Sequence, residues 1–311
     1  MKPKVIVIVG PTASGKTSLS IELAKKINGE IVSCDSMQIY KDMDIGSAKP
    51  TKEEMQGIKH YIIDEVLPTE RFSVARYKQE AEGAIEEILQ KGKTPIVVGG
   101  TGLYANSLIY GIEYDDIKLD EKYREELMKI AETQEGLEKL YEEAKKIDKK
   151  AMEKISQNDK KRIIRILEIY KETGKTKTQL EIESRKNGVP YDYRVFAINM
   201  PREILYDRIN RRVDIMIEKG LIEEVEQLYK KYGNELRTSV QGIGYKEVID
   251  YLNGMYSKEE MIEKIKMETR RYAKRQLTWF RKIPNIIWID GLGNVQDNVN
   301  LILKEAELNE N

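Results

Sequence analysis

The stretch that decides the fold is residues 5–17, VIVIVGPTASGKT, close to the N-terminus. Its first five residues are all apolar and β-branched, which is typical of a strand buried on both faces of a parallel sheet. Residues 10–17 match the pattern G-x-x-x-x-G-K-[ST] at every fixed position. Apolar side chains then recur at helical spacing over residues 18–26. A strand, a glycine-rich loop and a helix in this order predict a phosphate-binding loop.

The fixed residues of this loop each have a physical part in holding phosphate. Glycines let successive backbone N–H groups converge, and the helix N-terminus adds partial positive charge. The Lys16 ammonium can neutralise phosphate oxygens, and the Thr17 hydroxyl can bind Mg²⁺. An ordinary glycine-rich turn is the alternative, but the strand and helix on either side disfavour it. The residues expected to hold a di- or triphosphate are Gly10, Pro11, Thr12, Ala13, Ser14, Gly15, Lys16 and Thr17.

The loop does not identify what its phosphate is attached to. No Asn-Lys-x-Asp element, with which GTPases read their base, occurs in the sequence. Residues 62–65, IIDE, could be read as a Walker-B strand, but the apolar stretch is short. Nucleotide kinases and enzymes that act on diphosphates remain as alternatives.

Strand and helix signals alternate on both sides of a purely helical segment. Residues 115–188 lack strand signals and contain Lys/Glu-rich amphipathic stretches with few Gly or Pro. We therefore predict an α/β fold, a P-loop NTPase-like parallel sheet with helices on both faces, over residues 1–114 and 189–311. Residues 115–188 would form an inserted all-helical domain. Strands are expected at 5–9, 30–33, 61–63, 95–98, 194–200 and 286–289, and the main sheet-domain helices at 73–91, 202–219, 221–232 and 258–282.

The composition excludes several kinds of site. With 311 residues, 40% hydrophobic and 34% charged, the chain is typical of a globular protein of two domains. One Cys and one His exclude disulfide frameworks and His-pair metal sites, so a general base is expected to be a carboxylate. The net charge of +0 leaves room only for local basic patches. No apolar run approaches the ~18 residues that span a bilayer, so we expect no membrane association. We also expect a cytoplasmic protein and a monomer.

Further motifs follow the phosphate loop along nearly the whole chain. The segments are 10–17, 33–50 (SCDSMQIYKDMDIGSAKP), 98–104 (VGGTGLY), 158–162 (NDKKR), 242–247 (GIGYKE) and 275–280 (RQLTWF). Together and in this order they resemble the bacterial tRNA dimethylallyltransferase (isopentenyl-tRNA transferase) family. Residues 105–107, ANS, depart from the family pattern, where a more basic or apolar helix start is expected.

The resemblance implies a reaction and its partners. A dimethylallyl group would pass from dimethylallyl diphosphate to N6 of the adenine 3′-adjacent to the anticodon, with release of diphosphate. The implied partners are the anticodon stem-loop of tRNA and the prenyl diphosphate, and the implied cofactor is Mg²⁺.

The aromatic amino group is a weak nucleophile, because its lone pair is delocalised into the ring, and a carboxylate must take its proton. Asp35 follows the strand that we expect beside the strand of the phosphate loop, so it would face the same crevice. The resemblance gives Asp35 the same role, that of general base. A helix N-cap or an outer ligand of Mg²⁺ is the alternative.

The leaving diphosphate needs positive charge around it, which Lys16 and Mg²⁺ on Thr17 can supply. Arg208 and Arg212 lie four apart on one predicted helix face. The resemblance places Arg212 on the diphosphate, and a solvated, Glu-paired helix surface is the alternative. Thr101 follows two glycines after a predicted strand, and the resemblance gives it a contact near the transferred group or the target nucleotide.

The implied RNA contacts fall into three groups. Gln38 resembles the residue that reads the target adenine, whose edge an amide can pair with bidentately once the base is flipped out. A helix of the insertion has basic residues on one face, with Ile163, Leu167 and Tyr170 expected opposite. A second basic cluster lies at 268–282, where Tyr272 and Trp279 are available for stacking, although such a charge run is usually a solvated face. The residues that the resemblance places on tRNA are Asp35, Ser36, Met37, Gln38, Thr101, Arg124, Asp159, Lys160, Lys161, Arg162 and Arg165.

Two other classes of function remain open. In a P-loop kinase, Arg208 and Arg212 would be lid arginines and Asp35 would accept a hydroxyl proton. In an RNA-binding protein, a nucleotide in the loop would be only a structural ligand. The large helical insertion and the basic helix favour the prenyltransferase.

Overall fold

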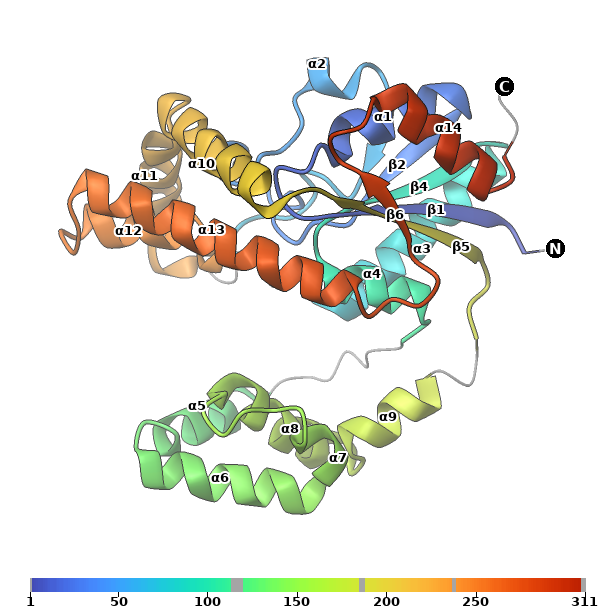
Figure 1. Cartoon of the computed structure of the whole chain (residues 1–311). Helices are drawn as coiled ribbons and strands as arrows, with labels where there is room; N and C mark the ends of the chain where they lie inside the picture. The colour runs from blue at the N-terminus through green and yellow to red at the C-terminus, as the bar shows by residue number, and fades with distance from the viewer. Residues whose placement is uncertain (1, 113–119, 185–187, 237–238, 309–311) are drawn as a thin grey trace. The chain divides into compact units, whose positions relative to one another are not determined.

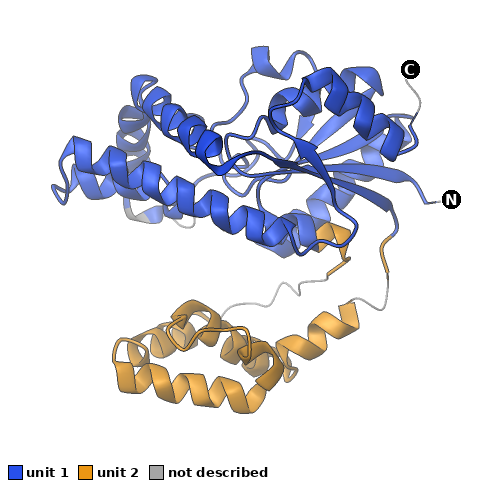
Figure 2. Cartoon of the chain, in the orientation of Figure 1, with its two compact units in different colours: residues 1–106, 190–311 blue, residues 107–189 orange. Residues whose placement is uncertain are grey.

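The computed structural model describes residues 2–112, 120–184, 188–236 and 239–308. The chain forms two compact units, one of residues 1–106 and 190–311 and the other of residues 107–189 (Figure 2). The first predicted domain boundary, between residues 114 and 115, lies outside the described residues.

A six-stranded sheet forms the centre of the first unit (Figure 1). Its strand order is β3-β2-β4-β1-β5-β6, and every pairing is parallel. Parallel strands place all their carboxyl ends at one edge, where α/β proteins bind their ligands. The strands are β1 (Lys4–Val9), β2 (Gly29–Ser33), β3 (His60–Tyr61), β4 (Thr94–Gly99), β5 (Asp192–Asn199) and β6 (Ile287–Asp290).

Strand β1 is central because its sequence can be buried on both faces. Residues 5–9 are at most 1% exposed. Ile6 and Ile8 belong to the core that also contains Leu23 of α1 and Ile302 of α14, and the side chains between them point to the opposite face. The unbroken apolar run therefore predicted both the strand and its central position.

Helices cover both faces of the sheet. In Figure 1, α1 and α14 lie on one face, and α3 packs against β2 and β4 from the other. This confirms the predicted α/β fold class. The helices outside the insertion are α1 (Lys16–Lys26), α2 (Lys52–Met55), α3 (Val74–Gln90), α4 (Gly102–Ile109), α10 (Arg202–Glu218), α11 (Leu221–Tyr232), α12 (Tyr245–Leu252), α13 (Lys258–Phe280) and α14 (Val295–Glu305).

Two predictions about the strands were wrong. The strand before Asp35, β2, is not beside β1, because β4 lies between them. The strand expected at 61–63 is β3, and it already ends at Tyr61. The chain turns there, since Ile62 and Asp64 have positive φ values of 61° and 59°. Such a turn excludes a Walker-B strand at 62–65, and the Asp64 carboxylate instead pairs with Lys49.

The second unit is helical where the structure describes it. Its helices are α5 (Glu121–Ile130), α6 (Gln134–Ile147), α7 (Lys149–Met152), α8 (Lys160–Thr173) and α9 (Lys177–Ser184), following the last residues of α4. Side chains of Asp120, Thr133 and Asp159 cap the N-termini of α5, α6 and α8. Ile163 and Leu167 of α8 are buried in this unit's own core, whereas Tyr170, expected beside them, is 43% exposed.

Helices α10 to α13 lie beyond the carboxyl ends of the strands (Figure 1). Among the helices of the described residues, none is long and apolar enough to cross a membrane.

Two glycines give a matched test of the packing. A Cβ at Gly99 would lie 2.1 Å from the Cys34 carbonyl oxygen and 2.2 Å from its carbon, and backbone on both sides has little room to move. Gly99→Ala should therefore destabilise the fold, on the scale of ~1–3 kcal/mol for overpacking. Gly83 lies inside α3 with nothing within 4 Å of its Cβ position, so Gly83→Ala should stabilise the chain by ~0.4–1 kcal/mol. Urea denaturation measures both changes, and similar midpoints for the two variants would contradict this account.

Candidate active site

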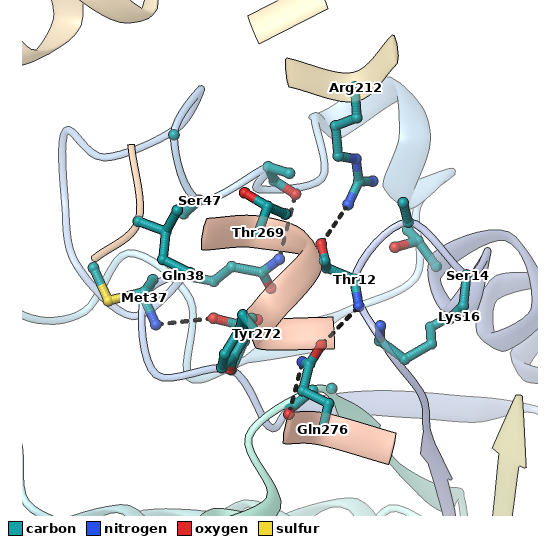
Figure 3. Close-up of a pocket in the computed structure, with 18 of the residues that line it drawn as sticks. Thr12, Ser14, Lys16, Met37, Gln38, Ser47, Arg212, Thr269, Tyr272 and Gln276 are labelled. Carbon is teal, nitrogen blue, oxygen red and sulfur yellow. Dashed lines mark hydrogen bonds between the residues drawn. The ribbon is translucent and has the colours of Figure 1, made fainter. Parts of the chain in front are cut away.

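A cavity of about 700 Å³ opens at the carboxyl edge of the sheet (Figure 3). The phosphate loop lines it, together with residues 35–38 after β2 and residues 98–100 at the end of β4. Helices α10 and α13 close the remaining sides with residues such as Arg212 and Tyr272. Segments that are distant in sequence therefore meet around one space.

The phosphate loop has the backbone conformation that an anion site requires. Ala13 and Gly15 have positive φ values of 63° and 91°, and α1 begins directly after Gly15. Alternating backbone handedness makes successive N–H groups converge in a concave nest. The Ser14 hydroxyl lines the cavity and is buried without a hydrogen-bond partner. A buried polar group in this state is satisfied when a ligand oxygen binds.

Lys16 is held inside the loop. Its ammonium donates to the carbonyl oxygens of Gly10 at 3.0 Å and Pro11 at 2.8 Å. Burial, and then the positive charge of Arg212, lower the pKa of Lys16 to about 8. The negative charge of Asp35 opposes this fall of the Lys16 pKa but does not outweigh it.

Asp35 lines the same cavity, in the turn after β2. Its Oδ1 accepts a hydrogen bond from the Met37 N–H at 2.9 Å. No helix begins at Asp35, since the next one is α2 at Lys52, so the helix-cap alternative is excluded. Burial raises the pKa of Asp35, although the Met37 N–H and the charge of Lys16 oppose that rise. A carboxylate with a raised pKa is a stronger base than an exposed one.

Arg212 enters the cavity from α10. Its guanidinium donates to the Thr12 hydroxyl at 3.2 Å, so it reaches the phosphate loop directly (Figure 3). Burial lowers the pKa of Arg212, although the charges of Glu54 and Asp35 oppose that fall. Among the residues of α10, Arg212, Val213 and Met216 line the cavity and Arg208 does not. The structure therefore separates the two arginines that helical spacing had paired.

Gln38 and Thr101 have different positions around the site. Gln38 lines the cavity, where its amide donates to the Ala48 carbonyl and accepts from the Ser33 hydroxyl, both at 3.3 Å. Thr101 is not among the lining residues. Its hydroxyl accepts from the Ser36 N–H at 3.0 Å, which ties the turn after β4 to the turn after β2.

The sequence analysis named Tyr272 of α13 but missed the other residues of the face to which it belongs. Ile265, Thr269, Tyr272 and Gln276 recur at helical spacing and all line the cavity. Their spacing of four, three and four residues was the available signal, but the basic residues of the same helix obscured it. The structure gives part of that basic cluster other partners, since Arg270 bonds Asn210 and Arg271 pairs with Glu268.

Several residues of the insertion that we expect to bind RNA form ion pairs within the unit of residues 107–189. Glu168 of α8 is 2% exposed and pairs with Arg124 at 3.2 Å and Arg165 at 3.4 Å. Asp159 caps α8 and also pairs with Arg162. Arg124 and Arg165 are thus held together from two helices. The departure from the family pattern at residues 105–107 lies inside α4, and none of those residues lines the cavity.

A phosphate loop, a buried carboxylate and an arginine around one cavity define an α/β enzyme of the P-loop class. The match to a known family is more specific. The chain belongs to the IPP transferase family, whose sequence pattern matches residues 38–283. This confirms the resemblance found in the sequence and gives the chain the class of a prenyltransferase, so the kinase and the purely RNA-binding alternatives lose their support.

Relatives and solved structures agree with this family. The tRNA dimethylallyltransferase of Acetivibrio thermocellus is 56% identical over 92% of this chain and 91% of its own length. That of Caldanaerobacter subterraneus is 52% identical over 93% and 92%. The crystal structure of tRNA isopentenylpyrophosphate transferase from Bacillus halodurans is 46% identical, with a TM-score of 0.73 over 98% of this chain and 97% of that one. A eukaryotic dimethylallyltransferase, solved acting on tRNA, is 36% identical, with a TM-score of 0.78 over 93% and 74%.

The lowered pKa of Lys16 generates a pH prediction. Neutral Lys16 cannot balance phosphate charge, so kcat/KM for the phosphorylated substrate should fall as the pH rises through about 8. A bound anion favours the charged lysine, so the corresponding fall in kcat should lie at higher pH. In Lys16→Arg the side chain stays charged, so the residual activity should not fall as the pH rises through about 8. Steady-state rates from pH 6 to 10 test it, and an unchanged alkaline limb in Lys16→Arg would assign the titration to another group.

Proposed function

We propose that this chain transfers the dimethylallyl group of dimethylallyl diphosphate to N6 of the adenine 3′-adjacent to the anticodon in tRNA. Membership of the IPP transferase family supports the reaction class. The observation that carries the assignment is that the phosphate loop, Asp35 and Arg212 line one cavity. Such a cavity can hold a diphosphate at one end and a carboxylate near the reacting carbon.

The chemical step needs a base and a stabilised leaving group. The bond between C1 of the prenyl group and the diphosphate oxygen breaks as the bond from C1 to N6 forms. Asp35 takes the proton that N6 loses, and its raised pKa suits it to this role. Diphosphate leaves with the electron pair of the broken bond.

The charge that develops on the diphosphate is stabilised by groups already in place. Lys16 and Arg212 lie on either side of Thr12 and are charged below the pKa of Lys16. Loop N–H groups and the Ser14 hydroxyl would add hydrogen bonds. The Thr17 hydroxyl lines the cavity and, with diphosphate oxygens, would hold a divalent cation, for which we propose Mg²⁺. The cation supplies further charge neutralisation to the leaving group.

Gln38 is proposed to read the target adenine. To pair with the adenine edge, its amide exchanges the two bonds of 3.3 Å that it makes to Ala48 and Ser33. Both bonds are long, so the exchange costs little. Ser36 and Met37 line the cavity beside Gln38 and would contact the flipped nucleotide. Thr101 does not line the cavity, and we propose that it supports this contact by accepting the Ser36 N–H.

The helical unit of residues 107–189 is proposed to bind the anticodon stem-loop. Its basic residues on and near α8 suit phosphate contacts, which position RNA without reading its sequence. Glu168 would hold Arg124 and Arg165 in place while leaving donors for phosphate oxygens. We further propose that the chain works as a monomer in the cytoplasm, where its tRNA substrate is found. The contacts expected in this unit are Arg124, Asp159, Lys160, Lys161, Arg162 and Arg165.

Nucleoside analysis of tRNA tests the assignment. Unmodified tRNA incubated with the chain, dimethylallyl diphosphate and Mg²⁺ should gain N6-dimethylallyl-adenosine at the position next to the anticodon. Asp35→Asn keeps an acceptor for the Met37 N–H but removes the base, and should lower kcat by ~10²–10⁴-fold with tRNA affinity retained.

Asp42→Asn is the matched control, because Asp42 lies in the same loop region but pairs with Lys231 and does not line the cavity. It should keep wild-type kcat. ATP turnover without prenyl transfer would instead favour a kinase. If Asp35→Asn weakens only the affinity for dimethylallyl diphosphate, Asp35 would instead be interpreted as an outer ligand of Mg²⁺.

A second prediction concerns the insertion. Replacing Lys161, Arg162 and Arg165 together by Ala should weaken tRNA binding and reduce the salt slope by roughly two to three, since each phosphate contact contributes about 0.7–0.9. Affinity for dimethylallyl diphosphate without RNA should not change. A control triple variant replaces Lys139, Lys145 and Lys146, exposed lysines of α6 in the same unit. Equal salt slopes for the two triple variants would show that the α8 residues do not bind RNA.

A further inference from the structure

Gln276 is a buried polar side chain of α13 that joins two loops of the active site. It is 4% exposed. Its carbonyl oxygen accepts from the Thr12 N–H at 2.9 Å, and its amide donates to the Gly100 carbonyl at 2.9 Å (Figure 3). Thr12 belongs to the loop after β1, and Gly100 follows β4, the neighbouring strand. One side chain therefore sets the distance between the two loops.

The backbone after β4 is shaped to let α13 approach. A Cβ at Gly100 would lie 2.2 Å from the Gln276 amide nitrogen. A Cβ at Gly102 would lie 2.9 Å from the Trp279 side chain, one turn further along the helix. Gly100 and Gly102 thus let α13 approach the turn after β4, because a side chain at either position would displace Gln276 or Trp279.

The bond to Thr12 determines where that residue points. Its N–H is directed to Gln276, and its hydroxyl accepts from Arg212 at 3.2 Å. A chain of contacts therefore runs from Gln276 through Thr12 to the arginine that faces the diphosphate. Only an uncharged amide has both the acceptor for the Thr12 N–H and the donor for the Gly100 carbonyl at this length.

We propose that Gln276 is a positioning residue, which holds Thr12 and through it Arg212 in register for the diphosphate. It does not touch the reacting atoms. Its loss leaves a buried donor and a buried acceptor without partners, so the loop must move to satisfy them. A displacement of about 1 Å in such a site can cost ~10²-fold in rate.

The experiment uses the full chain with Gln276→Met, which keeps the length of the side chain and removes both hydrogen bonds. We expect kcat/KM for dimethylallyl diphosphate to fall by roughly 10- to 100-fold, and the affinity for inorganic diphosphate to weaken. Affinity for tRNA should stay within about twofold, since no RNA contact is assigned to Gln276. Thr278→Ala, an exposed position of α13 whose hydroxyl bonds only its own helix, is the control and should match the wild type.

A double-mutant cycle with Thr12→Ala tests the route through Thr12. That change removes the Arg212 bond but keeps the N–H bonded to Gln276. If Gln276 acts through Thr12, the double variant should be no worse than about the poorer single variant, whereas independent effects would multiply. Multiplying effects, or a Gln276→Met variant with only a lower melting temperature and unchanged kcat/KM, would overturn the proposal.

The measurement of kcat/KM rests on the proposed function, whereas the measurement of affinity for inorganic diphosphate does not. Wild-type chain that fails to prenylate tRNA would reject the function, while diphosphate affinities of the same variants would still decide the role of Gln276. If Gln276→Met does not fold, Gln276→Leu, which also removes both hydrogen bonds without adding charge, replaces it in the same cycle. A wild-type diphosphate affinity in Gln276→Leu combined with Thr12→Ala would also overturn the proposal.

Discussion

The active site depends on the parallel pairing of β1 with β4 and β5. Because these strands and β2 run in one direction, the loops that follow them leave the sheet at the same edge. The phosphate loop follows β1, Asp35 follows β2, Gly100 follows β4, and α10 with Arg212 follows β5. No local sequence signal brings these residues together. The register of the strands does, since Val9 pairs with Gly99 on one side and with Ala197 on the other.

The charges of the site are arranged for a substrate that brings its own negative charge. Lys16 and Arg212 are both buried enough for their pKa values to fall, and Asp35 is buried enough for its pKa to rise. Each shift indicates a charge that is poorly solvated in the ligand-free chain. The diphosphate that we propose to bind at these two cations would supply the opposite charge, and the same contacts would stabilise the leaving group.

The sequence predicted the parts of the site that depend on local chemistry. The apolar run of residues 5–9 and the motif after it fixed β1, the loop and α1, because strand, turn and helix each have their own residue pattern. Asp35 could be named as a residue of the site, and it does line the cavity, while its role as base stays a prediction. Its strand could not be placed, since the order of strands depends on crossovers that leave no local trace. Gln276 was missed for a similar reason. An amide in a basic helix has no distinctive pattern, and its role appears only when Thr12 and Gly100 lie within bonding distance. Arg208 shows the opposite error, because helical spacing places it on the face of Arg212 but α10 turns only part of that face to the cavity.

The pairing of β1 with β5 also constrains how the chain can fold as it is made. Lys4 lies opposite Asp192, so the first strand to emerge from a ribosome lacks one neighbour until the whole of residues 107–189 has been synthesised. Until then β1 is an apolar strand with an open edge, which is prone to wrong pairings. The helices of the insertion form from neighbouring segments, and such local contacts form quickly. The insertion can therefore reach its compact form while the sheet is still incomplete. The arrival of β5 then gives β1 its second neighbour, and α13 and β6, which follow β5, complete the cavity and the sheet late in synthesis.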